Sequence, residues 1–247
     1  MPLENLLVMA LALGVGGLVK GATGMGLPLV ALPILAAFLG VQHAVALMCF
    51  PGIITNIWQV WRFRAAMWET DFLPAMTVGG AAGIVAGTWF IVSLPERALS
   101  FSLGLLVFAY IGLRLANPHF IVSRRLGRRL APGFGFGAGL LQGATGIGSP
   151  ISVTFIHAMR LGRAAHVFAI SMIFLLSTVV QVPALMVAGV MTSRIAVEGI
   201  LALAPALAVM PIGNWLAGRM SQATFDRIVL ALLALVALEL LWKSVAP

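Results

Sequence analysis

The chain has 247 residues, of which 61% are apolar and only 9% are charged. A soluble domain carries roughly 25% charged residues, so this composition excludes a soluble globular protein and predicts an integral membrane protein. The net charge of +8 is typical of basic cytoplasmic loops and not of nucleic-acid binding. We therefore expect the lipid bilayer as a partner and no nucleic acid.

Long apolar segments follow one another along the chain, five in each half. They are 3–19, 27–39, 44–63, 72–92, 98–115, 131–141, 149–159, 164–189, 195–218 and 224–242. Their length excludes the short alternating strands of an outer-membrane barrel. A bilayer core of ~30 Å needs about 20 helical residues, so three segments, 27–39, 131–141 and 149–159, are too short to span it. We expect an all-α fold in which such half-helices enter the membrane, break and return near the midplane, because irregular backbone survives there only inside protein or beside a wet cavity.

One Gly-rich stretch occurs twice, at 17–30 and at 139–152, with an offset of 122 residues. Eight of its fourteen positions are identical. Further on, Gly87 matches Gly213 at an offset of 126, which implies a four-residue insertion. A Gly-rich, Pro-terminated break at the same place in both halves of a membrane protein indicates a binding site at a repeat interface.

The basic residues are distributed unevenly between alternate loops, with 12 of 15 on one side and 3 on the other. The richer side is expected in the cytoplasm, so both termini are expected on the periplasmic side. Five segments per half would start the second half from the opposite face, as in inverted-topology repeats. The expected division is a first repeat at 1–115, a basic cytoplasmic linker at 116–130 and a second repeat at 131–247.

The repeated stretch has the features of an anion site. Its prolines, Pro28 and Pro150, suit the first position of a helix, which would aim free N–H groups and a positive helix end at a ligand. Its glycines permit close approach of the backbone to a ligand, and Lys20 adds a full positive charge. The candidate substrate contacts are Lys20, Gly21, Thr23, Gly24, Gly26, Pro28, Asn56, Gln59, Gln142, Gly143, Thr145, Gly146, Gly148, Ser149 and Gln181.

Each candidate also has a structural interpretation. Lys20 could cap helix carbonyls or extend to the interface, although a central charge costs about 2.5–3.5 kcal/mol on insertion scales and so favours function. Glycines spaced four apart suit helix packing, which we favour for 79, 83 and 87, while we favour site geometry for the repeated stretch. The amides of Asn56, Gln59 and Gln181 suit either interhelical hydrogen bonds or ligand contacts, and Ser149 could cap the helix that follows it.

Several classes of site are absent from the sequence pattern. The single cysteine, Cys49, excludes an internal disulfide, and no cluster has metal-ligand spacing. The acidic residues, Glu198 among them, lie at or near loops or segment ends, so no midplane carboxylate is expected for a proton or sodium relay. We expect no enzymatic activity, no cofactor and no metal, and the sequence indicates no particular oligomeric state.

The pattern Gly-x-x-Lys-Gly-x-x-Gly-x-Gly-x-Pro, repeated after a basic central loop, resembles the TauE/SafE family of bacterial inner-membrane permeases. The resemblance covers both halves. It implies a secondary transporter of a small anion, such as sulfite or an organosulfonate, that works by alternating access between inverted repeats. A passive anion channel built on the same broken helices is the alternative. The second copy has Gln142 where the first has Lys20, so the two copies need not be equivalent.

Overall fold

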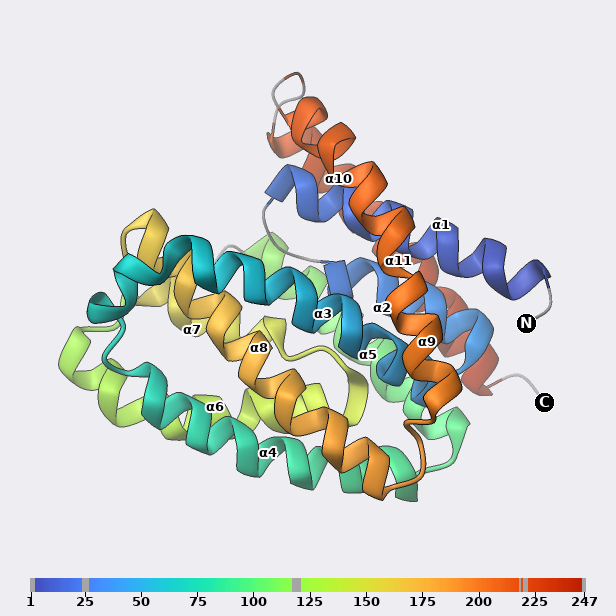
Figure 1. Cartoon of the computed structure of the whole chain (residues 1–247), viewed down its shortest axis with the longest axis horizontal. Helices are drawn as coiled ribbons and strands as arrows, with labels where there is room; N and C mark the ends of the chain where they lie inside the picture. Colours follow the sequence, from blue (N-terminus) through green and yellow to red (C-terminus); the bar gives the residue numbers. More distant parts are fainter. Residues whose placement is uncertain (1–2, 24–26, 117–120, 218, 220–221, 246–247) are drawn as a thin grey trace. The chain divides into compact units, whose positions relative to one another are not determined.

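The computed structural model describes residues 3–23, 27–116, 121–217, 219 and 222–245, and these form helices joined by short connections, without a strand among them (Figure 1). Seven helical stretches in this part of the chain are long and apolar enough to cross a membrane. The prediction of an all-α, multi-pass membrane protein is confirmed.

The helices follow one another with few residues between them. In chain order they are α1 (Leu3–Thr23), α2 (Leu27–Leu39), α3 (Val41–Phe63), the 3-10 helix η1 (Arg64–Glu69), α4 (Leu73–Ser93), α5 (Glu96–Ala116), α6 (Arg124–Thr145), α7 (Ser149–Ala158), α8 (Arg163–Val187), α9 (Ser193–Leu201), α10 (Leu203–Ala217) and α11 (Gln222–Val245).

Helix α6 corrects the expectation that 131–141 is a short half-helix. It begins at Arg124, where the Ser123 hydroxyl accepts a hydrogen bond from the Leu126 N–H at 3.4 Å, and it runs for 22 residues. Ser is a favoured N-cap, and arginine is a good helix former, so the basic stretch joins the apolar one in a single helix. The helices α2 and α7 are short, as expected, with 13 and 10 residues.

The chain forms two compact units, and each takes helices from both halves of the sequence. The first unit comprises 1–50, 94–117 and 192–247, and the second comprises 51–93 and 118–191. In the first unit α1 packs on α10, α5 packs on α11, and α2 contacts α1 and α11. In the second unit α4 packs on α6 and α8, and α7 contacts α6 and α8.

The pairs α1–α10 and α4–α6 meet through glycines at backbone distance. A Cβ placed on Gly83 would collide with the main-chain oxygen of Phe136, and one on Gly139 with that of Gly80. The packing role expected for glycines 79, 83 and 87 is confirmed. Gly21 and Gly143 of the repeated stretch also lie against backbone, so these glycines pack helices whether or not they also approach a ligand.

The same close contacts occur in both units at equivalent sequence positions. The numbering differs by 122 between α1 and α6 and by 126 between α4 and α10. Gly17 contacts Ala206 in the first unit, as Gly139 contacts Gly80 in the second. In the same way Gly21 contacts Met210 as Gly143 contacts Ile84, and Gly213 contacts Leu18 as Gly87 contacts Leu140. The first apolar segment of each half therefore packs on the fourth apolar segment of the other half in the same register. The inverted orientation of the two halves in the membrane stays a prediction.

Candidate functional site

The first copy of the repeated stretch places a lysine at the buried end of a helix. Lys20 lies in the last turn of α1, with a side chain that is 6% exposed. Gly21 follows it against Met210 of α10. Helix α1 ends at Thr23, and Pro28 is the second residue of α2. Residues Gly24 and Gly26 lie outside the described part of the chain.

The second copy contains the predicted helix break. Helix α6 ends at Thr145, and Gly146 takes the left-handed conformation with φ of 74°. Glycine adopts this conformation without the steric cost that a side chain brings. Pro150 is the second residue of α7, one position later than predicted, because the N-cap is Gly148 and Ser149 is the first helical residue. The interpretation of Ser149 as a capping residue is therefore wrong.

Three consecutive N–H groups at this break have partners inside the second unit. The Gly146 N–H donates to the Gln142 main-chain oxygen at 2.8 Å, and the Ile147 N–H to Thr145 Oγ1 at 3.3 Å. The Gly148 N–H donates to Gln142 Oε1 at 2.9 Å. Gln142 and Thr145 thus satisfy the donors that the sequence suggested for a ligand, and they fix the path of the chain from α6 to α7.

Gln181 of α8 completes this arrangement. Its Nε2 donates to the Gln142 main-chain oxygen at 3.0 Å, and its Oε1 accepts from Gln142 Nε2 at 3.3 Å. The Gln181 side chain is 1% exposed. Gln142, Gly146, Gly148 and Gln181 therefore form one hydrogen-bonded group in the second unit, beside the hydrogen bond between Thr145 and Ile147.

The other amide candidates lie on α3. Asn56 and Gln59 are buried, and Gln59 Oε1 accepts a hydrogen bond from Ser171 Oγ of α8 at 3.2 Å. The sequence reasoning missed Ser171, and it also missed Thr88, whose buried hydroxyl has no hydrogen-bond partner among the described residues. Their only signal in the sequence is a small polar residue inside an apolar segment, which is common in membrane helices.

A buried carboxylate in the first unit is a second feature that the sequence reasoning did not anticipate. Glu198 lies in α9, near the start of its segment as expected, yet its side chain is almost fully buried. Arg194 Nε lies 2.9 Å from Glu198 Oε1, and His43 Nε2 lies 3.1 Å from Oε2, an ion pair when His43 is protonated. The charge of Glu198 is thus paired, as buried charges in proteins usually are. In the described ranges, no three His, Cys, Asp or Glu side chains gather as a metal site would require.

A multi-pass helical chain with a paired glycine-rich stretch, of which one copy contains a buried lysine and the other breaks a helix, has the architecture of a membrane transport protein. The family model described as "Sulfite exporter TauE/SafE" matches residues 8–240, and the protein belongs to this family. The resemblance seen in the sequence is confirmed, and the family is one of transporters and not of enzymes. No curated protein and no solved structure gives a match.

Proposed function

We propose that the protein carries a small sulfur oxyanion or organosulfonate, such as sulfite, across the bacterial inner membrane. The observation that supports this most strongly is the burial of Lys20 at the repeated stretch in a chain of the sulfite exporter family. A cationic side chain inside a membrane segment is costly, and it usually marks a substrate pathway. Lys20 would supply the charge that attracts the anion.

The two copies of the stretch would have different roles in anion binding. In the first copy, Lys20, Gly21 and Thr23, with the following Gly24, Gly26 and Pro28, would surround the anion with positive charge and N–H donors. In the second copy, Gln142 Oε1 already accepts from the Gly148 N–H. This neutral oxygen would occupy the place of an anion oxygen, and the break would accept substrate only when Gln142 turns away.

Further polar contacts would come from the remaining candidates. These are Asn56, Gln59, Gly143, Thr145, Gly146, Ser149 and Gln181.

We further propose that transport proceeds by alternating access. The moving bodies would be the two compact units and not the sequence halves. Moving one half against the other would separate α1 from α10 and α4 from α6, whose backbones interlock through glycines. Each compact unit contains one interlocked pair and one copy of the stretch, so a movement of the units would leave both pairs in contact.

The membrane potential could supply the energy for export. A divalent anion that leaves an inside-negative cell gains about 2.3 kcal/mol per charge per 100 mV, roughly 4.6 kcal/mol for two charges. Flux into proteoliposomes against an imposed potassium diffusion potential measures this directly. Flux that ignores the potential would instead indicate electroneutral coupling.

A binding screen tests the substrate class. The purified protein would be heated with sulfite, thiosulfate, sulfate, sulfoacetate, taurine or chloride, because a ligand that binds only the native state raises the unfolding temperature. We expect sulfite or a sulfonate to stabilise the protein most, and equal stabilisation by chloride would contradict the proposal.

Saturable, slow flux separates a carrier from the alternative, a passive channel on the same helices.

A further inference from the structure

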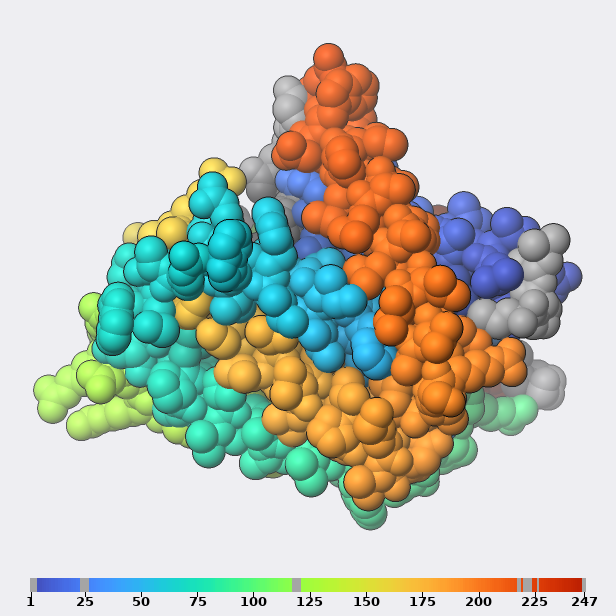
Figure 2. All heavy atoms as spheres, viewed as in Figure 1, coloured from blue at the N-terminus to red at the C-terminus, as the bar shows by residue number. Residues whose placement is uncertain are grey.

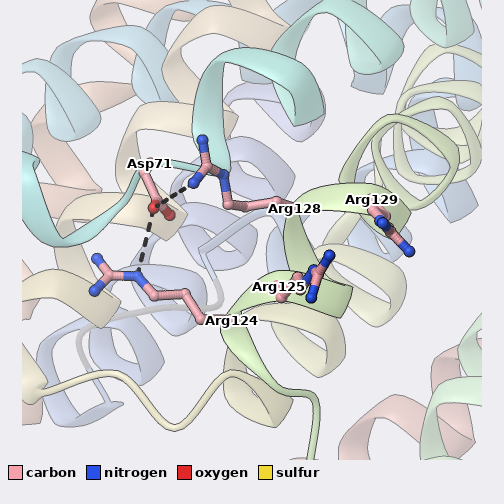
Figure 3. A pocket seen from close by; sticks show the side chains of 5 residues that line it. All are labelled: Asp71, Arg124, Arg125, Arg128 and Arg129. Atoms are coloured by element: carbon pink, nitrogen blue, oxygen red, sulfur yellow. Dashed lines mark ion pairs between the residues drawn. The ribbon is translucent and has the colours of Figure 1, made fainter.

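A basic pocket lies at the beginning of α6, in the second unit. It has a volume of about 330 Å³ and is lined by Asp71, Arg124, Arg125, Arg128 and Arg129 (Figure 3). This volume falls in the range of about 300–1,000 Å³ that is typical of small-molecule sites, so the pocket has room for more than a single ion. In the all-atom view the light-green side chains at the start of α6 extend outward from the surface (Figure 2).

The charges of the pocket are only partly compensated. Asp71 Oδ2 lies 3.5 Å from Arg124 Nε and 3.5 Å from Arg128 Nη1. Arg125 and Arg129 point away from Asp71 (Figure 3), and neither has a carboxylate partner in the described part of the chain. Four arginines against one aspartate leave an excess of positive charge, and the N-terminal end of α6 adds to it.

The residues between the arginines show what kind of anion fits. Leu126 and Leu130 are 47% and 38% exposed. Leu126 directly follows Arg125 in the sequence, and Leu130 directly follows Arg129. Residues four apart share a helix face, so an exposed leucine stripe runs along α6 beside the stripe of Arg125 and Arg129. A small soluble anion gains nothing from contact with this apolar surface, whereas the acyl chain of a lipid can pack against it.

An exposed tryptophan beside the pocket indicates the membrane interface. Trp68 is 82% exposed, and it directly precedes Glu69, whose main-chain oxygen accepts a hydrogen bond from Arg124 Nη2 at 3.0 Å. Tryptophan is enriched at the level of the lipid headgroups. The arginines next to it therefore lie where phosphate groups of the bilayer are available.

We propose that this pocket binds the headgroup phosphate of an anionic phospholipid. Arg125 and Arg129 donate charge-assisted hydrogen bonds to the phosphate, for which the planar guanidinium is well suited. Leu126 and Leu130 contact the first part of an acyl chain. Arg124 and Arg128, held by Asp71, keep the start of α6 in place. Basic pockets at the ends of membrane helices bind anionic headgroups by the same physics.

Native mass spectrometry of the full-length protein in detergent tests this proposal with phosphatidylglycerol, phosphatidylcholine and inorganic phosphate as separate additions. We expect phosphatidylglycerol to bind most tightly. Arg125→Gln with Arg129→Gln should weaken it about thirtyfold, roughly fivefold for each arginine. Arg125→Lys with Arg129→Lys keeps the charge, and hence the membrane orientation, and should retain most of the binding. Arg227→Gln, at an exposed arginine of α11, is the matched control and should change nothing.

A second pair of variants separates a lipid from a free anion. Leu126→Ser with Leu130→Ser should weaken phosphatidylglycerol binding and leave any binding of inorganic phosphate unchanged. Displacement of the lipid by equimolar inorganic phosphate, with no effect of the leucine changes, would overturn the proposal in favour of a soluble anion. If the double glutamine variant binds the lipid as tightly as wild type, the proposal is wrong. Arg125 and Arg129 would then serve only to set the orientation of the protein in the membrane.

Discussion

Gln142 and Gln181 hydrogen-bond each other twice, once between their side chains at 3.3 Å and once from Gln181 Nε2 to the Gln142 main-chain oxygen at 3.0 Å. Gln142 also accepts from the Gly148 N–H at 2.9 Å. One side chain thus ties the end of α6 to the start of α7 and to α8. The first copy has the buried Lys20 at this position, so a charged side chain stands in one unit where the other unit has the hydrogen-bonding amide.

Loss of the Gln142 amide should destabilise the second unit. Gln142→Met keeps the side-chain length but leaves the buried Gly148 N–H without its acceptor, which typically costs about 1–3 kcal/mol. Chemical or thermal unfolding in detergent measures the loss. A double-mutant cycle with Gln181→Met should give a coupling energy of roughly 0.5–3 kcal/mol. Strict additivity of the two changes would contradict the interaction.

Two glycines of the same region should respond to alanine with opposite signs. Gly146→Ala forces a side chain into the left-handed region at φ of 74°, which should cost roughly 1–2 kcal/mol. Gly133→Ala, inside α6 with open space around its Cβ position, should be stabilising by about 0.5–1 kcal/mol. Gly146→Val should abolish transport while the protein still inserts. Normal transport by this variant would show that the break serves packing alone.

The equivalent glycines of the two units should be equally sensitive to a methyl group. Gly17→Ala and Gly139→Ala each press a Cβ into the backbone of the facing helix, and overpacking of this kind typically costs about 1–3 kcal/mol or more. Gly112→Ala, with nothing within 4 Å of its Cβ position, is the control. Tolerance at one site of the pair and not at the other would argue against the repeated packing.

The sequence predicted those features that depend on local pattern. Apolar segment 164–189 corresponds to α8 (Arg163–Val187). Residues that the sequence matches at offsets of 122 and 126 make equivalent contacts between α1 and α10 and between α6 and α4. The position of the break in the second copy, with its proline in the first turn of α7, also followed from glycine and proline chemistry.

Features that depend on tertiary contacts were not predictable in the same way. In the fold Gln181 hydrogen-bonds Gln142, and Gln59 accepts a hydrogen bond from Ser171, and neither partner is indicated by the local pattern of its segment. Glu198 lies near a segment start, and only the packing of α9 buries it beside His43. Helix α6 exceeded its apolar segment because a helix can begin in charged residues once Ser123 caps it.

The membrane orientation is a prediction with a direct measurement. Both termini should face the periplasm and the region before α6 the cytoplasm, because the segments expected from the sequence put 12 of the 15 basic residues on one side. After Cys49→Ser, single cysteines at the exposed positions Ile121 and Val245 report accessibility to an impermeant thiol reagent in intact cells. Labelling at 245 and not at 121 is expected, and the reverse pattern would overturn the assigned orientation.

The central claim is that Lys20 carries the charge that binds the anion. Sulfite flux and affinity in proteoliposomes test it with wild type, Lys20→Met and Gln142→Met. A hydrogen bond to a charged group is worth roughly 1.5–3 kcal/mol and a neutral one about 1 kcal/mol, so Lys20→Met should lose about tenfold to a hundredfold in affinity. Gln142→Met removes only neutral hydrogen bonds and should change the affinity less. Equal sulfite affinity in wild type and Lys20→Met, with both proteins folded, would remove Lys20 from the site and leave it the role of a helix cap.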